Sequence, residues 1–136
     1  DLFIKKINCK YTILRFGGIY GKNGPKHLGL NKFINLALKQ KVIKFNGNKK
    51  SKRNYIFVKD AAKIILFCIK NKKFGTFYIG GKTLSFKEML KKISLILTKK
   101  QNIIFTNIKH KLDNQIIKND RIVKITSFAQ SLKLIK

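Results

Sequence analysis

Apolar residues along this chain follow two spacings, one typical of short strands and one typical of helices. Short runs of β-branched and other apolar residues predict strands, and apolar residues that recur every three or four positions predict helices. Strands that alternate with helices predict an α/β fold, and because the strands are few and short we expect half of a larger domain. The predicted strands lie at 11–16, 42–45, 54–58, 76–79 and 102–106, and the predicted helices at 2–8, 29–40, 61–69, 86–97 and 127–132.

Two polar positions mark the starts of predicted helices. Asp60 stands directly before an apolar helical repeat, which predicts that its carboxylate caps that helix. Ser85 is followed three residues later by Glu88, the spacing of a capping box. These signals place both helix starts directly after predicted strands or turns.

Composition limits the classes of function. The chain has 136 residues, of which 44% are hydrophobic, enough for one compact domain with a core. Its net charge is +27, but only three of its 32 basic residues are Arg, the residue that base-reading proteins favour. A basic nucleic-acid-binding module is therefore the alternative and not the leading hypothesis. The charge favours anionic ligands such as nucleotide phosphates.

The sequence carries no membrane or secretion signal. No apolar run approaches the roughly 18 residues that a membrane span needs, and the first residues do not follow the signal-peptide pattern. Their pattern is typical of the middle of an amphipathic helix, so we expect the chain to be a fragment of a longer protein. Cys9 and Cys68 lie among apolar residues without metal-ligand spacing. That pattern predicts buried, reduced thiols and a cytoplasmic protein.

A glycine-rich loop follows the first predicted strand. Gly18, Gly21 and Gly24 have the spacing of a dinucleotide-binding loop. Such a loop needs an acidic residue about 20 positions later, and no Asp or Glu occurs between Asp1 and Asp60. We therefore expect the bare backbone of this loop to approach a substrate and not to hold the cofactor's diphosphate.

Other catalytic patterns are weak. Tyr55 and Lys59 have Y-x-x-x-K spacing, but on a strand those residues lie roughly 13 Å apart. His27 and His110 have no nucleophile motif nearby, and the five acidic residues of the chain are too few to indicate a carboxylate pair or a metal site. Arg53 is the best single candidate, because a lone Arg among lysines suits bidentate binding of phosphate.

Several blocks, read in order, resemble the extended short-chain dehydrogenase/reductase family of NAD-dependent epimerases and dehydratases. Ile13–Gly21 resembles the family's "ILRxxNVYGPG", and Phe45–Asn48 resembles its "YGDG" turn. Arg53–Ala62 resembles "RDFIYVDDVA", and Phe77–Leu90 resembles "YNVGGGEPVSLRELAE". The resemblance is clearest over 1–97, and it is specific because the blocks agree in order and spacing.

The resemblance implies a fold class and a division of labour. The chain would be the C-terminal part of a Rossmann-like extended enzyme, with its smaller substrate-binding subdomain and without the N-terminal cofactor half. Residues 1–136 would form a partial epimerase/dehydratase domain that binds a nucleotide sugar, and NAD or NADP would be bound mostly by the missing half. The family's catalytic residues would lie before residue 1, so the chain alone would not turn over. A degenerate, non-catalytic scaffold and a homodimer of the full-length protein stay open.

The resemblance also assigns site residues, none of them catalytic and none a metal ligand. Phe16 and Gly17 would approach the nicotinamide of the cofactor, and the glycine loop would contact the substrate. Phe45 would lie near the nucleotide base of the substrate, and Arg53 would bind its phosphates. Gly18 stands where the family commonly has a substrate-binding Asn, Tyr78 replaces a frequent Asn, and Lys59 replaces a frequent Asp. The implied cofactor-binding residues are Phe16 and Gly17, and the implied substrate-binding residues are Gly18, Tyr20, Gly21, Phe45 and Arg53.

Overall fold

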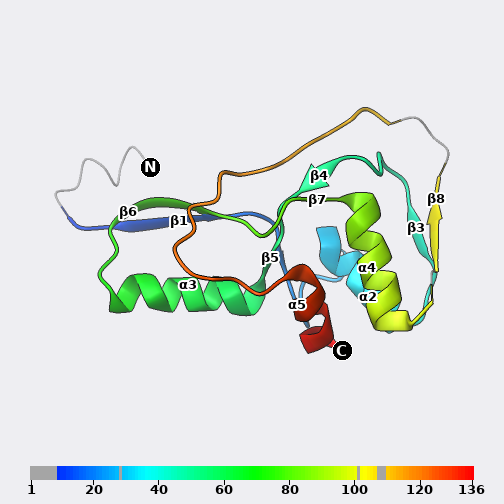
Figure 1. Cartoon of the computed structure of the whole chain (residues 1–136), viewed down its shortest axis with the longest axis horizontal. Coiled ribbons are helices and arrows are strands. Elements are labelled where there is room, and N and C mark those ends of the chain that lie inside the picture. Colours follow the sequence, from blue (N-terminus) through cyan, green and yellow to red (C-terminus); the bar gives the residue numbers. More distant parts are fainter. Residues whose placement is uncertain (1–8, 28, 101, 107–109) are drawn as a thin grey trace.

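The computed structural model of the chain describes residues 9–27, 29–100, 102–106 and 110–136 (Figure 1). None of the helices among these residues is long and apolar enough to cross a membrane. The helix predicted at 2–8 lies outside the described residues. The strands are β1 (Thr12–Phe16), β2 (Ile19–Tyr20), β3 (Ile43–Phe45), β4 (Lys52–Arg53), β5 (Ile56–Phe57), β6 (Gly75–Ile79), β7 (Leu84–Ser85) and β8 (Ile103–Phe105). The helices are α2 (Gly29–Leu38), α3 (Val58–Lys70), α4 (Phe86–Thr98) and α5 (Phe128–Ile135).

The strands form four two-stranded sheets, and three of these are parallel. β1 pairs with β6 so that Thr12 lies opposite Gly75 and Phe16 opposite Ile79. β2 pairs with β5, and β3 pairs with β8, also in parallel. Among the described residues, only β4 and β7 pair in the antiparallel sense. In Figure 1, β1 and β6 lie at one end of the molecule and β3 and β8 at the other.

This pairing corrects the predicted fold class. We expected the C-terminal part of an extended enzyme with its smaller subdomain and without the cofactor half. Parallel strands joined through helices are instead the arrangement of a nucleotide-binding, Rossmann-like sheet, and three of the four pairs are of this kind. The structure supports an α/β Rossmann-like fragment, so the expectation of a C-terminal part without the cofactor half is wrong.

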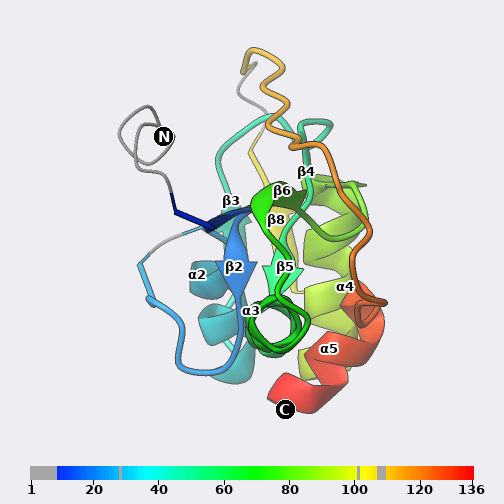
Figure 2. The same cartoon turned by 90° about the vertical axis from the view of Figure 1, so that its left-hand side faces the viewer.

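The core has two clusters of buried apolar side chains. The larger one joins α2, α4 and α5 through side chains such as Ile34, Leu90 and Leu132. The smaller one lies between α3 and the β1–β6 pair and contains Ile64, Cys68 and Ile79. Figure 2 looks along α3, with α2 on one side and α4 and α5 on the other. The helices bury one face each, as their apolar spacing predicts.

The capping box predicted at Ser85 is confirmed. The Ser85 backbone N–H donates to Glu88 Oε2 at 2.7 Å, and Ser85 Oγ accepts from the Glu88 backbone N–H at 3.3 Å. The same arrangement at Ser127 and Gln130 begins α5 and was not anticipated as a capping box. Each box satisfies backbone donors that a helix start leaves free.

The prediction that Asp60 caps α3 is wrong. α3 begins at Val58 instead, its N-cap is Phe57, and Asp60 lies within the first turn. The buried Asp60 carboxylate accepts hydrogen bonds from the backbone N–H of Thr126 at 2.8 Å and from its Oγ1 at 2.9 Å. Its partner thus lies 66 residues later, beyond the reach of a local pattern.

The two cysteines differ. Cys68 is buried, as expected, and burial raises the pKa of its thiol. Cys9 is exposed, which corrects the expectation for that residue. The reason is its position, because it precedes β1 and lies outside both clusters of the core.

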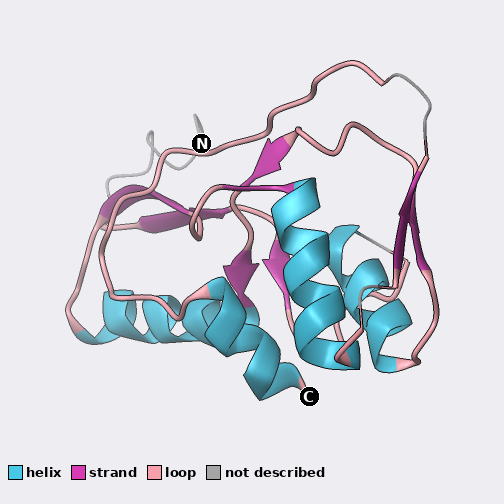
Figure 3. Cartoon of the chain, turned by 45° about the vertical axis from the view of Figure 1, so that its right-hand side comes forward, coloured by secondary structure: helices cyan, strands magenta, loops and turns pink. Residues whose placement is uncertain are grey.

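The C-terminal segment returns along the molecule before α5. In Figure 3 it is a long loop that passes over the strands. The side chain of Asn54 bonds the backbone of Ile117 in both directions, with Nδ2 donating at 2.9 Å and Oδ1 accepting at 3.2 Å. Asp120 Oδ2 accepts from the backbone N–H of Tyr78 at 2.9 Å. These bonds tie the returning segment to β6 and to the segment before β5.

The capping box makes stability depend on pH. Hydrogen bonds from Ser85 lower the pKa of Glu88, so its contribution is complete above the ordinary glutamate pKa of about 4.3 and is lost as pH falls through the lower folded-state value. We expect Glu88→Ala to lower the free energy of unfolding by up to about 1 kcal/mol at pH 7, because Glu88 is solvent-exposed. Urea unfolding between pH 2.5 and 7 measures this difference.

The matched control is Lys91→Ala, an exposed change on the same helix that removes no capping group. Its effect on the free energy of unfolding is expected to stay nearly constant between pH 2.5 and 6. A Glu88→Ala effect that is equally constant over that range would contradict the account.

Candidate functional site

Three backbone segments approach one another closely at Asn54 and Tyr55, and glycines make this close approach possible. A Cβ on Gly17 would lie 2.4 Å from the Asn54 carbonyl oxygen, and one on Gly81 would lie 2.2 Å from the Tyr55 carbonyl oxygen. A Cβ on Gly80 would lie 2.4 Å from Asn54 Nδ2. Because backbone atoms cannot move aside as a flexible side chain can, these glycines bring the ends of β1 and β6 against residues 54–55.

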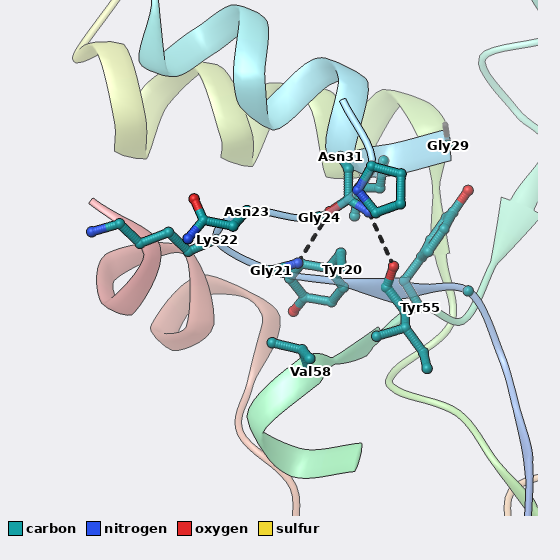
Figure 4. Close-up of a pocket in the computed structure, with 13 residues that line it drawn as sticks. Tyr20, Gly21, Lys22, Asn23, Gly24, Gly29, Asn31, Tyr55 and Val58 are labelled. Carbon is teal, nitrogen blue, oxygen red and sulfur yellow. Dashed lines mark hydrogen bonds between the residues drawn. The ribbon is translucent and has the colours of Figure 1, made fainter. Parts of the chain in front are cut away.

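The ring of Tyr55 lies between two other glycines. A Cβ on Gly18 would lie 2.3 Å from Tyr55 Cε1, and one on Gly29 would lie 3.3 Å from the Tyr55 hydroxyl oxygen. Gly29 has φ +44, a backbone conformation that favours glycine. We call this arrangement of Gly18, Gly29 and the Tyr55 ring the tyrosine seat (Figure 4).

Two pockets open on either side of the tyrosine seat. The first has a volume of about 550 Å³ and is lined by the glycine loop 18–25, by residues 29–31, and by Tyr55 and Val58. The second has a volume of about 420 Å³ and is lined by residues 16–18, 53–55 and 115–117. Gly18 and Tyr55 line both pockets. Both volumes lie within the range of roughly 300–1,000 Å³ that is usual for small-molecule sites.

Asn31 holds the glycine loop in place at the first pocket. Its Oδ1 accepts from the Gly21 backbone N–H at 3.1 Å, and its Nδ2 donates to the Ile19 carbonyl at 3.3 Å. A Cβ on Gly24 would lie 2.5 Å from the Asn31 side chain. The sequence analysis missed Asn31, although a polar residue on the apolar face of the predicted helix was a usable signal.

The two tyrosines of the first pocket differ in their hydroxyl groups. Tyr20 Oη and Ser131 Oγ form a buried hydrogen bond of 2.5 Å, and burial raises the pKa of Tyr20 to about 12. Burial also raises the pKa of Tyr55, while the positive charge of Arg53 opposes that rise. Both phenols are therefore protonated at neutral pH and can donate hydrogen bonds.

Arg53 lines the second pocket and is held by three kinds of contact. Its Nη2 donates to Asp113 Oδ2 at 2.6 Å, and its Nη1 donates to the carbonyl oxygens of Lys52 and Asp113. Its guanidinium also lies 5.3 Å from the ring centre of Phe86. The side chain is 14% exposed, so Arg53 is oriented before any ligand arrives. Asp113 lies 60 residues later, and the sequence analysis missed it as a partner.

The structure brings most of the predicted site residues to the two pockets. Phe16, Gly17, Gly18 and Arg53 line the second pocket, while Gly18, Tyr20 and Gly21 line the first. Phe45 lies elsewhere, in the larger core cluster, and its ring packs against Phe86, with 4.9 Å between the ring centres.

The chain is similar to known proteins in both sequence and fold. The sequence profile of the NAD dependent epimerase/dehydratase family matches residues 3–80, more than half of the chain. None of the curated proteins matches. Among solved structures, a UDP-N-acetylglucosamine 4-epimerase from Bacillus cereus is 25% identical, with a TM-score of 0.83, over 98% of this chain and 47% of its own.

Two further solved structures show the same fold. A UDP-glucose 4-epimerase from Thermotoga maritima, solved with UDP-glucose, is 20% identical with a TM-score of 0.78, over 98% of this chain and 47% of its own. A dTDP-glucose 4,6-dehydratase from Bacillus anthracis, solved with NAD, is 19% identical with a TM-score of 0.72, over 91% of this chain and 42% of its own. The chain thus spans less than half the length of these enzymes.

The profile match completes the correction of the fold class. Its residues 3–80 contain β1, β2, β5 and β6, which form two of the parallel pairs. A match to an NAD dependent family over this Rossmann-like region contradicts the expectation that the cofactor half is missing. What the match and the pairing support is an α/β Rossmann-like fragment of the family.

The family depends on NAD, so the fit of the glycine loop to a dinucleotide can be examined. The positions where Gly18, Gly21 and Gly24 lack side chains are filled by Tyr55, Val58 and Asn31 of the same chain. No acidic residue is among those that line the first pocket, so the loop lacks the carboxylate that binds the ribose hydroxyls in a dinucleotide site. The loop does not fit a dinucleotide, and we derive no hydride transfer through it. Among the described residues, no cluster of His, Cys, Asp or Glu could hold a metal ion.

The tyrosine seat can be tested by a double-mutant cycle. The φ of Gly18 is not in the left-handed region, so the effect of Gly18→Ala is purely steric. We expect this change to lower the free energy of unfolding by about 1–3 kcal/mol, because the new methyl group meets the Tyr55 ring. In a Tyr55→Ala background the same change is expected to lose at least half of its effect.

Urea unfolding of the four proteins measures this coupling. Equal effects of Gly18→Ala in both backgrounds would show that the ring does not occupy the space beside Gly18.

Proposed function

The chain belongs to the NAD dependent epimerase/dehydratase family, and we propose that its two pockets bind the nucleotide sugar on which an epimerase, dehydratase or reductase of this family acts. The observation that carries the proposal is that the two pockets meet at Gly18 and Tyr55, with a fixed Arg in one of them. A nucleotide sugar has two chemically different ends joined by a diphosphate. Two pockets that share a wall at Gly18 and Tyr55, with a cation in one of them, suit such a ligand.

The diphosphate is assigned to the second pocket. Arg53 presents a planar guanidinium there, already oriented by Asp113 and Phe86, and Arg binds phosphate oxygens in a bidentate manner. The net charge of +27 adds a long-range attraction for anions. In this proposal Phe45 acts indirectly, because it packs beneath Phe86, the ring that supports Arg53.

The glycine loop is assigned to the remainder of the ligand. Gly18 and Gly21 line the first pocket with backbone alone, and Tyr20 forms part of its wall. Phe16 and Gly17, at the end of β1, are proposed to approach the nicotinamide of the bound cofactor. Residues 1–136 are proposed to act as part of an epimerase/dehydratase domain, and no residue of this chain is assigned as catalytic.

The proposal is tested by titrating the chain with UDP-N-acetylglucosamine, UDP-glucose and dTDP-glucose in a calorimeter. Saturable binding of at least one of them is expected. A DNA duplex titrated at physiological salt tests the alternative function, because tight binding with a steep salt dependence would favour a nucleic-acid-binding module. Absence of binding by all three nucleotide sugars would contradict the proposal.

Arg53 provides the sharpest single test. We expect Arg53→Ala to raise the Kd for the bound nucleotide sugar about tenfold or more, because a charge-assisted hydrogen bond is lost. In a full-length enzyme that contains this chain, the same change is expected to raise KM more than it lowers kcat.

Asp113→Asn is the matched control, since it weakens the ion pair of Arg53 but keeps the guanidinium in the pocket. It is expected to change the Kd by no more than about threefold. An unchanged Kd in a folded Arg53→Ala protein would remove Arg53 from the site.

A further inference from the structure

The hydroxyl of Tyr55 is available for a ligand, whereas that of the neighbouring Tyr20 is not. Tyr20 is bonded to Ser131 on α5. Within the part of the chain that the structure describes, no hydrogen bond is formed by the Tyr55 hydroxyl, which lies on the wall of the first pocket and is directed toward Gly29 (Figure 4). The first pocket therefore has one tyrosine hydroxyl that is already bonded and one that is free to bind.

The position of Tyr55 is fixed by its surroundings. Gly18 on one side and Gly29 on the other leave room for the ring and for little else, because a Cβ on Gly18 would lie only 2.3 Å from the ring. A ring held in this way presents its hydroxyl without losing much conformational freedom when a ligand binds. The phenol is also neutral at physiological pH, because the ordinary pKa of tyrosine is about 10 and burial raises the pKa of Tyr55 further. It therefore does not repel an anionic ligand.

Which group of the ligand contacts the Tyr55 hydroxyl depends on the order of groups along the ligand. Arg53 and Tyr55 both line the second pocket, and Tyr55 alone of the two also lines the first. If the diphosphate lies at Arg53, the ligand continues into the sugar on one side and into the nucleoside on the other, and the sugar is the end placed in the first pocket. Around that pocket the polar groups are amides, a lysine and backbone, with Asn23, Asn31 and Lys22 among them. Groups of this kind bind sugar hydroxyls.

We infer that the Tyr55 hydroxyl donates a hydrogen bond to the sugar of the bound nucleotide sugar and so distinguishes it from the free nucleoside diphosphate. This inference rests on the proposed function, because it needs a nucleotide sugar in the two pockets. It assigns specificity to a residue that was not among the predicted site residues, because the spacing of Tyr55 from Lys59 was interpreted as accidental.

The test compares UDP-N-acetylglucosamine with UDP on the wild-type chain and on Tyr55→Phe, which keeps the ring in its seat and removes only the hydroxyl. Tyr55→Phe is expected to raise the Kd for UDP-N-acetylglucosamine about five- to tenfold, the usual effect of one lost neutral hydrogen bond. Its Kd for UDP is expected to change less than twofold. Tyr78→Phe is the matched control, because Tyr78 lines neither pocket and its ring faces Arg15. It is expected to leave both constants unchanged.

The outcomes separate the inference from the proposed function. Failure of the wild-type chain to bind UDP-N-acetylglucosamine or any other nucleotide sugar would overturn the proposed function, and the inference with it. Wild-type binding that Tyr55→Phe leaves intact would overturn the inference alone. Equal weakening of UDP and UDP-N-acetylglucosamine would also overturn it, because the hydroxyl would then act on the nucleotide. Thermal unfolding of each variant shows whether a loss of binding reflects a loss of fold.

Discussion

The structure depends on a close approach of three backbone segments at Asn54 and Tyr55. Gly17 and Gly81 allow the approach because a side chain at either position would meet a carbonyl oxygen. Overpacking of this kind typically costs about 1–3 kcal/mol even where side chains can move, and here the opposing atoms belong to the backbone. The end of β1, the end of β6 and the start of β5 are therefore held at one point, and the two pockets open beside it.

The returning C-terminal segment holds this point from outside. Asn54 bonds the backbone of Ile117, and Asp60 bonds Thr126 further along the same segment. Tyr20 then bonds Ser131 on α5, which packs in the larger core cluster. A segment with little regular structure thus connects the smaller cluster with the larger one, through these polar contacts and through Ile122, Val123 and Ile125, which pack against the smaller cluster. Such contacts explain why a stretch with a weak apolar pattern still has a defined path.

Local patterns in the sequence predicted local structure well. Apolar spacing located β1, α2, β6 and α4 to within a few residues, because each buries one face against a neighbour. The capping box at Ser85 is a contact between residues three apart, so it too was visible. Order and spacing of short motifs identified the family, which the profile match confirms.

Contacts between distant residues could not be predicted in this way. Asp60 was predicted to cap a helix from its place before an apolar repeat, but its partner Thr126 lies 66 residues away. The pairing of Arg53 with Asp113 was not predicted for the same reason, because these residues are also far apart in the sequence. The predicted fold class was wrong about the missing cofactor half, because the order of motifs along the chain does not show how the strands pair. The glycine spacing at 18–24 matches a cofactor loop, but the missing acidic residue argued against that function, and the glycines in fact accommodate Tyr55, Val58 and Asn31.

The central claim is that a ligand with a diphosphate and a sugar lies across the tyrosine seat. A crystal structure of the chain grown with saturating UDP-N-acetylglucosamine tests it most directly. The account predicts electron density that runs from Arg53 in the second pocket, past the Tyr55 hydroxyl, into the pocket formed by the glycine loop. Density for the nucleotide sugar at any other surface, with both pockets filled only by water, would contradict it.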